Sequence, residues 1–369
     1  MTFTELRRQD PHTRTYLGSP SLVRLDNGDL LATHDYFGPG CPLNHEGSQF
    51  LSSVYRSTDN GATWPNLTHL AGAFWSSLFL HAGALWLLGC SAEYGSIVIR
   101  RSIDGGLTWT RPVDEHSGLL RRGGPGHTPP NYHCAPVPVV SHGGRLYRAF
   151  ENCDPCLWPT GFRSLVISAA ADADLLAAAS WRVSNQLAFD PAWAPDLPLP
   201  GWLEGNVVVT PGGELVNLLR FNASPRSELA CWVTIGDEGA TQRFDPATGF
   251  IDFPGGMSKF TIRRDPGSGR YLTLSNNITD PRRPGARNVL SLHASADLRH
   301  WRHVSTLIQD DQPQAAEEST RQTGFQYVDW QFDGPDLIYL VRTAYGGAHS
   351  YHDSNRITFH RLAGYGQLL

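Results

Sequence analysis

The stretches STDNGATW (residues 57–64) and SIDGGLTW (residues 102–109) share the pattern S-x-D-x-G-x-T-W. Each follows a β-prone run that ends in arginine, SVYR at 53–56 and IVIRR at 97–101. Ser and Asp side chains bond turn amides, Gly adopts dihedral angles that other residues avoid, and Trp offers a large ring for burial. The pattern therefore predicts a strand, a tight turn and a second strand, with each Trp ring between neighbouring sheets.

This repeated pattern resembles the Asp box of the sialidase superfamily. In that superfamily the box closes the outer hairpin of a β-propeller blade and lies far from the active face. The shortened stretch SADLRHW (residues 295–301) is interpreted as a degraded copy of the same turn. The resemblance therefore implies a β-propeller, and it says little about the reaction.

A second repeat consists of a β-rich strand, a turn with glycine and an apolar strand. It occurs six times, and its turn glycines lie 55 to 69 residues apart at Gly28, Gly83, Gly144, Gly213, Gly269 and Gly334. Such an interval suits a four-stranded antiparallel blade with some long loops. The sequence therefore predicts an all-β protein, a single β-propeller domain over residues 1–369 with six blades, or seven if one blade has no glycine turn. We expect residues 3–6 to pair with residues 357–360 and to close the ring.

The composition of the 369-residue chain fits an ordered protein with many turns. Apolar residues make up 40% and charged residues 18% of the chain, with 37 Gly and 26 Pro, which favours short strands over a helical protein. The net charge of −5 and the lack of a basic run argue against nucleic acid as a partner. No run approaches the roughly 18 consecutive apolar residues of a membrane span, and the N-terminus shows no apolar signal-peptide core. We therefore expect no membrane partner and a cytoplasmic protein, or a secreted one if a leader has been removed.

Overlaying the six hairpins places a polar group near the end of each second strand. Antiparallel pairing puts the starts of the first strands at the same end of the blade. The residues brought together in this way are His34, Trp75, His133, Glu151, Glu204, Asn206, Arg220, Lys259, Asn276, Gln326, Tyr327 and Arg342. Strand ends are also polar simply because they face solvent. A set rich in Arg, His, Asn and Glu nevertheless predicts a binding site at one mouth of the ring.

Five short segments carry a second resemblance. They are THDYFG (33–38), WSSLF (75–79), EYG (93–95), YHCAPVP (132–138) and WLEGN (202–206). They are similar to propeller enzymes that remove terminal L-rhamnose from α-1,4-linked D-glucuronate, which have been described as rhamnosidases and as lyases. The resemblance extends loosely over most of the chain. It implies a seven-bladed propeller, an oligosaccharide substrate with an acidic sugar, and a catalytic histidine in the first blade, which falls on His34.

β-Elimination at a uronate sets requirements that the mouth residues meet. The carbanion formed by removal of H5 delocalises into the carboxylate, whose charge therefore needs to be offset, and Arg220 and Arg342 are suited to this. A base that titrates near neutrality is also needed. His34, oriented by Asp35 or Glu46, is the predicted base. The sequence therefore favours a lyase as the main hypothesis.

The remaining mouth residues are assigned to proton donation and substrate binding. His133 or Tyr94 is the predicted proton donor to the leaving oxygen. Substrate binding is predicted for Trp75, Glu151, Glu204, Asn206, Lys259, Asn276, Gln326 and Tyr327. No cofactor or metal site is predicted, because the CDPC pair (153–156) has no second pair of matching spacing and His349 with His352 has no third ligand.

Hydrolysis and binding without turnover are the alternatives. A hydrolase, including one of the rhamnosidase type, needs two carboxylates about 5 to 10 Å apart. Glu151 and Glu204 on adjacent blades are its predicted pair. A propeller that binds a glycan at the same mouth without turning it over would use the same side chains.

A sialidase-like hydrolase is a further alternative. Sialidases carry a Tyr/Phe-Arg-Ile-Pro motif in the first blade, whose Arg belongs to a triad that clamps the substrate carboxylate, and they use a Tyr/Glu nucleophile pair and an Asp acid. The segment YLGSP (16–20) keeps the proline but has Gly18 or Ser19 at the arginine position. Glu204 and Tyr327 are the residues available for the nucleophile pair, but the sequence around them does not fit the sialidase motifs.

Overall fold

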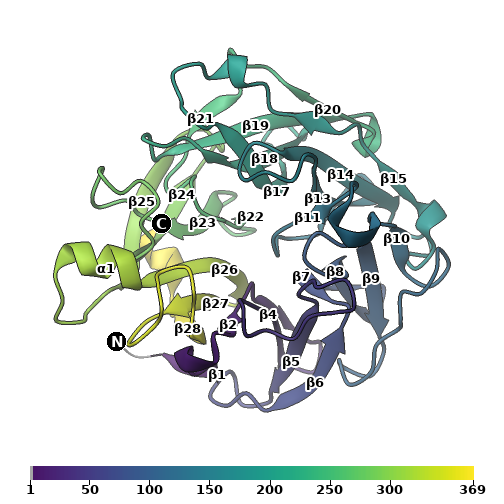
Figure 1. Ribbon diagram of the computed structural model, residues 1–369, viewed down its shortest axis with the longest axis horizontal. Helices are drawn as coiled ribbons and strands as arrows, with labels where there is room; N and C mark the ends of the chain where they lie inside the picture. Colours follow the sequence, from purple (N-terminus) through teal and green to yellow (C-terminus); the bar gives the residue numbers. More distant parts are fainter. Residues whose placement is uncertain (1–2) are drawn as a thin grey trace.

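The computed structural model describes residues 3–369 and shows six antiparallel sheets arranged as blades around one axis (Figure 1). The chain passes once around the ring, from purple at the N-terminus through teal and green to yellow at the C-terminus. The predicted six-bladed β-propeller is confirmed, and the seven blades implied by the resemblance to the rhamnose-releasing enzymes are wrong for this chain. Within residues 3–369 no helix has the length and apolar character needed to cross a membrane.

The strands of each blade follow one another along the chain. Blade 1 contains β2 (Tyr16–Leu17), β3 (Ser21–Arg24), β4 (Leu30–Phe37), β5 (Leu51–Ser57) and β6 (Asn66–Ala71). Blade 2 contains β7 (Phe74–His81), β8 (Ala84–Cys90), β9 (Ile97–Ser102) and β10 (Leu119–Arg121). Blade 3 contains β11 (Tyr132–His133), β12 (Val140–His142), β13 (Arg145–Cys153), β14 (Phe162–Ala170), β15 (Trp181–Val183) and β16 (Leu187–Ala188).

The second half of the ring follows the same plan. Blade 4 contains β17 (Gly201–Val209), β18 (Leu215–Asn222), β19 (Leu229–Gly236), β20 (Thr241–Phe244) and β21 (Phe250–Asp252). Blade 5 contains β22 (Ile262–Arg264), β23 (Tyr271–Asn276), β24 (Val289–Ser295) and β25 (Trp301–Gln309). Blade 6 contains β26 (Gly324–Asp333), β27 (Asp336–Ala344), β28 (Arg356–Leu362) and β1 (Thr4–Arg8), and the helix α1 (Ala316–Gln322) precedes it.

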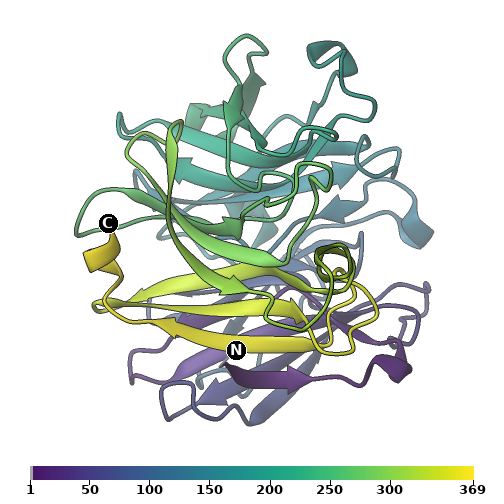
Figure 2. The ribbon, with the colours of Figure 1, turned by 90° about the vertical axis from the view of Figure 1, so that its left-hand side faces the viewer.

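The ring closes because blade 6 takes its outermost strand from the N-terminus. β1 pairs antiparallel with β28, with Thr4 opposite Phe359 and Glu5 opposite Thr358. Figure 2 shows the purple β1 alongside the yellow β28. Leu6 of β1 is buried in an apolar cluster that also contains Phe359. The predicted pairing of the two chain ends is therefore confirmed.

The six turn glycines of the predicted hairpins share one backbone conformation. All have positive φ, from 60° at Gly334 to 91° at Gly213. This region is open to glycine and costly for residues with a Cβ atom, which is why the turns are readable in the sequence. Each glycine joins the first and second strands of a blade, so the repeat correctly locates all six inner hairpins.

Both Asp boxes form the same turn at the outer edge of a blade. Asp59 accepts hydrogen bonds from the Ser57 hydroxyl at 2.7 Å and from the Thr63 amide at 2.9 Å. The Gly61 amide donates to the Ser57 hydroxyl at 2.8 Å, and Trp64 Nε1 donates to the Gly61 carbonyl at 3.1 Å. The second box repeats these bonds with Ser102, Asp104, Gly106, Thr108 and Trp109. The predicted turn is confirmed in both copies.

The degraded third copy keeps the hydrogen bonds without the glycine. The Leu298 amide donates to the Ser295 hydroxyl at 2.8 Å, and Trp301 Nε1 donates to the Leu298 carbonyl at 3.0 Å. Leu298 has a φ of 68°, which is costly for a residue with a Cβ atom. The network of Ser, Asp297 and Trp therefore keeps the turn in place against local strain.

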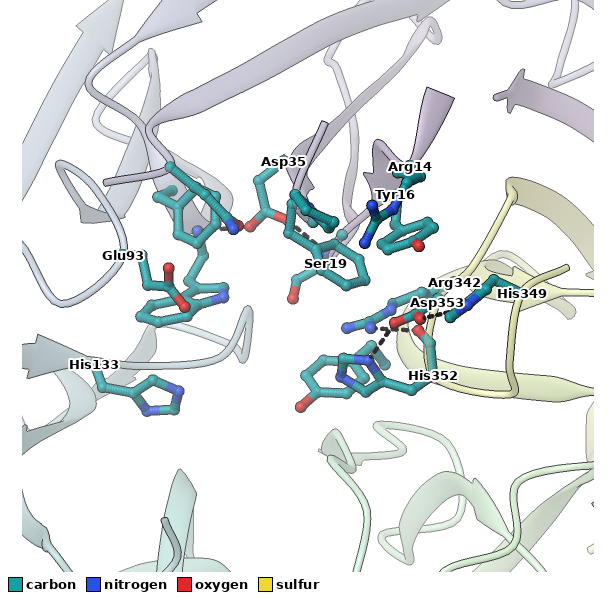
Figure 3. A pocket seen from close by; sticks show the side chains of 18 of the residues that line it. Arg14, Tyr16, Ser19, Asp35, Glu93, His133, Arg342, His349, His352 and Asp353 are labelled. Carbon is teal, nitrogen blue, oxygen red and sulfur yellow. Dashed lines mark hydrogen bonds and ion pairs between the residues drawn. The ribbon is translucent and has the colours of Figure 1, made fainter. Parts of the chain in front are cut away.

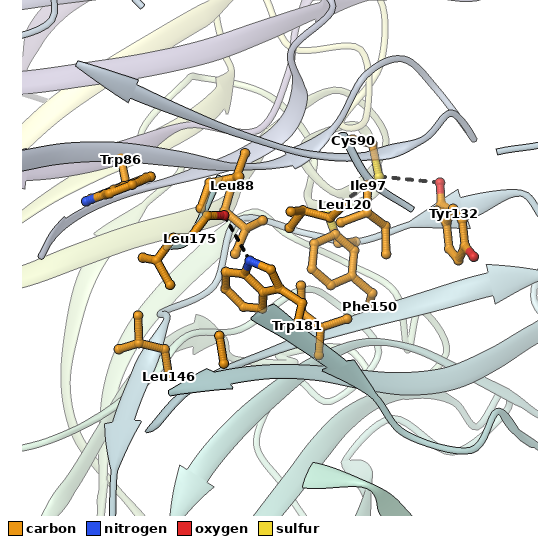
Figure 4. Packing of buried hydrophobic residues seen from close by; sticks show 14 of the residues in the cluster. Trp86, Leu88, Cys90, Ile97, Leu120, Tyr132, Leu146, Phe150, Leu175 and Trp181 are labelled. Atoms are coloured by element: carbon orange, nitrogen blue, oxygen red, sulfur yellow. Dashed lines mark hydrogen bonds between the residues drawn. The ribbon is translucent and has the colours of Figure 1, made fainter. Parts of the chain in front are cut away.

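Apolar clusters fill the spaces between neighbouring blades. In one of them Trp86 and Ile97 of blade 2 meet Phe150 and Trp181 of blade 3 (Figure 4). The Trp181 indole donates to the Leu175 carbonyl at 2.9 Å, so its polar edge is satisfied inside the cluster. Burial of such rings is the main favourable contribution to folding. It also fixes each blade relative to the next, which sets the positions of the residues at the mouth.

Candidate active site

A cavity of about 420 Å³ opens at the mouth of the ring. Blades 1, 2, 3, 4 and 6 all contribute side chains to this mouth cavity. They include Arg14, Tyr16, Ser19, Asp35, Trp75, Glu93, His133, Glu204, Tyr327, Arg342, His352 and Asp353. Figure 3 shows Asp35, the pair Glu93 and His133, and the pair Arg342 and His352 around a common space. The predicted convergence of polar residues at one mouth is present in the structure.

Three lining residues stand at matching bulges in the inner strands of blades 2, 4 and 6. Trp75, Glu204 and Tyr327 have φ values of 48°, 57° and 52°. At each position the pairing with the second strand skips a step, in β7, β17 and β26. A residue other than glycine in this conformation costs about 1 kcal/mol or more of folding free energy. Bulges are common next to functional sites, where they change the direction of a side chain. The fold therefore holds strained backbone at three points around the cavity.

Tyr327 and Glu204 meet within the cavity and share Arg220 as a partner. The Tyr327 hydroxyl donates to Glu204 Oε1 at 2.5 Å. Arg220 Nη1 donates to Glu204 Oε2 at 2.8 Å and to the Tyr327 hydroxyl oxygen at 3.2 Å. The three side chains come from blades 4 and 6 and are almost fully buried. A carboxylate, a phenol and a guanidinium are therefore held in one hydrogen-bonded cluster.

The charges of this cluster set its protonation. Burial alone would raise the pKa of the Glu204 carboxyl, but the positive charge and hydrogen bond of Arg220 bring that pKa below its ordinary value. Burial and the nearby Glu204 charge raise the pKa of Tyr327. Glu204 is therefore ionised and Tyr327 carries its proton near neutrality. A phenol that donates to an ionised carboxylate forms a pair suited to proton transfer.

Two further arginines approach the Tyr327 ring. The guanidinium carbon of Arg342 lies 4.8 Å and that of Arg287 lies 5.8 Å from the ring centroid. Arg342 donates Nε to the Ser354 hydroxyl at 3.1 Å and Nη2 to the His352 carbonyl at 2.6 Å. Its Nη1 has no hydrogen-bond partner among residues 3–369, so this donor is available to a ligand. Burial lowers the pKa of Arg342 to about 10, which leaves it charged near neutrality.

Asp35 occupies the first-blade side of the cavity. Its Oδ1 accepts the Ser19 amide and its Oδ2 accepts the Trp75 amide, each at 2.8 Å. Burial raises the pKa of Asp35 to about 6. A Cβ atom built at Gly18 would lie 1.5 Å from Asp35 Oδ1. At Gly18, one of the two positions that correspond to the first-blade arginine of sialidases, a side chain would therefore clash with Asp35.

His133 stands on the opposite side, supported by Glu151. His133 Nδ1 and Glu151 Oε2 are 2.8 Å apart, and Glu151 Oε1 also accepts the Gly205 amide at 3.1 Å. Burial alone would lower the pKa of His133, but the hydrogen bond and charge of Glu151 raise it above its ordinary value. The ring centroids of Trp75 and Tyr94 lie 4.4 and 6.0 Å from that of His133. The carboxylate and the aromatic rings fix the imidazole in place.

The structure places the thirteen predicted site residues in four groups. Trp75, His133, Glu204, Tyr327 and Arg342 line the mouth cavity. Glu151 and Arg220 bond directly to lining residues, and Tyr94 lines a neighbouring cavity. His34, Asn206, Lys259, Asn276 and Gln326 are not among the residues that line the mouth cavity.

His34 faces the interior of blade 1 and not the cavity. Its Nε2 lies 3.2 Å from the Tyr55 hydroxyl and its Nδ1 lies 3.0 Å from the Asp35 carbonyl. Burial lowers its pKa to about 4. Because side chains alternate between the two faces of a strand, the adjacent Asp35 takes the position expected for His34. The base role predicted for His34 has no support in this geometry.

The other residues outside the cavity hold blades and loops together. Asn206 donates to the Phe260 carbonyl at 3.1 Å, Asn276 to the Phe325 carbonyl at 2.8 Å and Gln326 to the Tyr351 carbonyl. Lys259 Nζ donates to the Thr261 hydroxyl and to the Val328 carbonyl, both at 2.6 Å. These contacts to protein atoms explain why such polar groups follow strand ends without reaching the mouth cavity.

Two cavity residues, Asp35 and Glu93, were not predicted as site residues. The sequence assigned Asp35 an orienting role and placed Glu93 only within a family segment. Arg287, which lies over the Tyr327 ring, was not predicted either. Strand alternation around His34 is the signal that points to Asp35. Arg287 follows a long loop and stands outside the hairpin repeat, so no repeat position marks it. Within residues 3–369 no group of three or more His, Cys, Asp or Glu side chains is placed to hold a metal ion.

Comparisons with known proteins identify the fold. No protein-family model matches the chain, and no curated protein matches its sequence. It is similar to the α-L-arabinanase of Penicillium chrysogenum solved with arabinobiose, with a TM-score of 0.58, 16% identity and coverage of 98% of each chain. It is also similar to the Hadza microbial sialidase, with a TM-score of 0.63, 17% identity and coverage of 99% of this chain and 69% of that one.

A third similar structure is the Trypanosoma rangeli sialidase in complex with sialic acid. The TM-score is 0.56 at 15% identity, over 96% of this chain and 55% of that one. At such identities the likeness establishes the fold, and the predicted sialidase-type propeller is confirmed. The finer resemblance to rhamnose-releasing enzymes gains no support from these structures.

Proposed function

We propose that this protein is an exo-acting retaining glycoside hydrolase that releases a terminal anionic sugar from a glycan, with Tyr327 as its nucleophile. The observation that carries the proposal is the 2.5 Å hydrogen bond from the Tyr327 hydroxyl to Glu204, with Arg220 bound to both, in the mouth cavity. The similar structures bear the names of glycoside hydrolases and sialidases. This agreement supports hydrolysis over the elimination favoured by the sequence.

In the first step the Tyr327 oxygen attacks the anomeric carbon while its proton passes to Glu204. The glycosidic C–O bond breaks, and the leaving oxygen takes a proton from a carboxylic acid in the cavity. A tyrosine nucleophile suits an anionic sugar, because a carboxylate nucleophile would be repelled by the negative charge of the substrate. Sialidases are known exceptions to the carboxylate nucleophile for this class of reaction.

In the second step water attacks the anomeric carbon of the glycosyl–tyrosine. The carboxylate that gave its proton takes one from the water, and the Tyr327 oxygen recovers its proton from Glu204. Two inversions at the anomeric carbon give net retention of configuration. Asp35 and Glu93 are the lining carboxyl groups outside the Glu204 cluster and outside the loop that carries Asp353.

The arginines support an anionic substrate. Three arginines near the cluster, Arg342, Arg220 and Arg287, are only 5%, 6% and 6% exposed. Within residues 3–369, Glu204 is the one carboxylate bonded to any of them. A buried guanidinium without a full set of partners is costly, and a ligand carboxylate would offset that cost through charge-assisted hydrogen bonds. Because neither Gly18 nor Ser19 supplies the first-blade arginine of sialidases, we expect a uronic acid and not a sialic acid.

Elimination remains a second candidate because of one observation. His133 lines the cavity, is held by Glu151 and has a pKa above its ordinary value. A histidine in that setting is suited to proton transfer near neutrality. A lyase would give an unsaturated uronate, which absorbs at 235 nm, whereas a hydrolase would not.

The proposal is tested with a panel of aryl glycosides of uronic acids, sialic acid and neutral arabinofuranose, together with oligosaccharides that end in a uronate. We expect hydrolysis of a uronide, with the released sugar first appearing in the anomeric configuration of the substrate by NMR. Rising absorbance at 235 nm would instead favour the lyase. Binding by calorimetry without any turnover across the panel would overturn both reactions and favour a glycan-binding propeller.

A further inference from the structure

A second cavity, of about 550 Å³, lies beside the mouth cavity. Its lining includes Phe50, Tyr94, Arg122 and His127, and we call it the side cavity. Among the residues that the structure describes, Glu93 is the one that lines both cavities. The Glu93 carboxyl therefore stands at the boundary between the two spaces.

The Glu93 side chain is not bound to any other part of the described chain. Its backbone amide donates to the Gln49 carbonyl at 2.8 Å, which fixes the main chain, but its carboxyl has no hydrogen-bond partner among residues 3–369. Burial raises the pKa of this carboxyl above its ordinary value. A half-buried carboxyl without a protein partner is free to exchange a proton with a ligand.

Asp35 differs from Glu93 in both respects. It lines the mouth cavity and not the side cavity. Each of its oxygens accepts a backbone hydrogen bond, from Ser19 and from Trp75. The bond to Trp75 holds the strained bulge of blade 2 against blade 1. Asp35 therefore acts as a positioning residue for the cavity wall.

We propose that the side cavity binds the leaving group of the substrate, a second sugar unit, and that Glu93 is the general acid and base of the reaction. This deepens the proposed hydrolase function and rests on it. The glycosidic oxygen joins the sugar that is released to the sugar that leaves, so it must lie where their two sites meet. That boundary is where Glu93 stands.

The proton balance closes with Glu93 in this role. Glu93 gives its proton to the glycosidic oxygen as the C–O bond breaks and the Tyr327 oxygen bonds to the anomeric carbon, while the phenol proton moves to Glu204. In the second step the Glu93 carboxylate takes a proton from water as the water oxygen bonds to the anomeric carbon. The bond from this carbon to Tyr327 then breaks, and Glu204 returns the phenol proton.

The chemistry of the side cavity suits a sugar. Tyr94 offers an aromatic face, and the Arg122 guanidinium and the His127 imidazole offer donors to hydroxyl groups. The ring centroids of Tyr94 and His127 are 6.5 Å apart, and His127 Nε2 lies 3.1 Å from the Ser48 hydroxyl. Contacts with neighbouring side chains therefore hold the Tyr94 ring and the His127 imidazole beside this space.

The decisive experiment compares Glu93→Gln with wild type on two substrates that carry the same anionic sugar. One has a sugar as the leaving group, and the other has a nitrophenol, which leaves without a proton. We expect Glu93→Gln to lose roughly 10²- to 10⁴-fold in kcat/KM on the disaccharide and less than about 10-fold on the aryl glycoside. Added azide should restore turnover of the aryl glycoside by Glu93→Ala and give a glycosyl azide.

Asp35→Asn is the matched control, and we expect it to lower activity by the same factor on both substrates. The assignment of Glu93 as the general acid would be overturned if Asp35→Asn lost more activity on the disaccharide than on the aryl glycoside while Glu93→Gln lost the same factor on both. Arg122→Ala tests the side cavity, where KM for the disaccharide should rise by roughly 10-fold and by a smaller factor for the aryl glycoside. Equal changes of KM for the disaccharide and the aryl glycoside would overturn the proposed leaving-group site.

The outcomes separate this proposal from the one on which it rests. An active wild type, an inactive Tyr327→Phe and a fully active Glu93→Gln would overturn the acid assignment and leave the hydrolase in place. A wild type that is inactive on every substrate would overturn both.

Discussion

The outer edges of the blades and the mouth of the ring both repeat a backbone conformation, but only the outer edges also repeat the side chains. In the two Asp boxes both the backbone turn and the side chains recur, and their matching hydrogen bonds differ by at most 0.2 Å. At the mouth the bulge recurs in blades 2, 4 and 6, but its residue is Trp75, Glu204 or Tyr327. A conformation repeated with its side chains indicates a folding requirement. A strained conformation repeated with different side chains indicates a site assembled from different groups.

The largest expected effect comes from Tyr327→Phe at the mouth. This change removes the attacking oxygen, so kcat/KM on an anionic glycoside should fall by roughly 10³-fold or more. The melting temperature should change little, because the ring stays in place and one hydroxyl is lost. Single-turnover assays on the purified variant, with circular dichroism as the check on folding, measure both quantities.

A Tyr327→Phe variant that kept wild-type turnover would show that the bulges of the inner strands serve folding, as the Asp boxes do. Glu204→Gln is its companion, since it keeps the shape of the base and removes its charge. It should slow the first step and leave Arg220 without its ionic partner. A lower melting temperature is therefore expected for Glu204→Gln and not for Tyr327→Phe.

At the outer edge, Trp64→Ala should affect stability and not the reaction. The Trp64 ring is 8% exposed and lies 5.2 Å from that of Phe359 in blade 6. Removing a buried Trp ring costs about 3 kcal/mol or more of unfolding free energy. Trp109→Ala is the matched control, because Trp109 holds the same place in the second box and is half-buried. We expect Trp109→Ala to lose less unfolding free energy than Trp64→Ala, which denaturant titration measures. Steady-state kinetics should show that both folded variants keep the kcat of the wild type.

The fold was predictable from the sequence because its signals are local. The turn glycines and the Asp boxes each occupy a few consecutive residues, and their backbone requirements restrict which residues fit. The strand pair of residues 3–6 with residues 357–360 followed from the need to close the last blade. The number of blades followed from counting turns, and the competing count of seven came from a resemblance and not from the residues of this chain.

The site was predictable in part, because its residues lie near strand ends but their direction depends on register. Tyr327, Glu204, His133 and Arg342 were placed together by the overlay of the hairpins. The resemblance to the rhamnose-releasing enzymes selected His34 over the adjacent Asp35, and neighbouring residues of a strand face opposite sides. The role proposed for Glu93 follows from the positions of two cavities, and no single segment of the sequence encodes these positions.

Arg342→Gln should give the next largest effect. The change removes the charge and the unbound Nη1 donor from the cavity wall. We expect KM for a uronide to rise roughly 10- to 100-fold, as for the loss of a hydrogen bond to a charged group. The matched substrate is the neutral amide of the same sugar, for which the rise should be much smaller. Equal changes for the acid and the amide would show that Arg342 only supports the loop through Ser354 and His352.

The smallest expected effect concerns His34, and it tests whether this residue belongs to the interior of blade 1 or to the mouth. Burial lowers its pKa to about 4, so the unfolded chain takes up a proton near the ordinary value of 6.5 while the folded protein does not. The contribution of His34 to the free energy of unfolding should therefore fall as the pH drops from 6.5 towards 4, and at about pH 5.5 this contribution has lost about 1 kcal/mol. His34→Gln should remove this contribution to the pH dependence of the unfolding free energy and keep measurable turnover. Asp35→Asn should change the slope of unfolding free energy against pH in the opposite direction, because the pKa of Asp35 is raised to about 6. Urea titrations across this pH range measure both slopes, and a complete loss of turnover in His34→Gln with an unchanged slope would return the base role to His34.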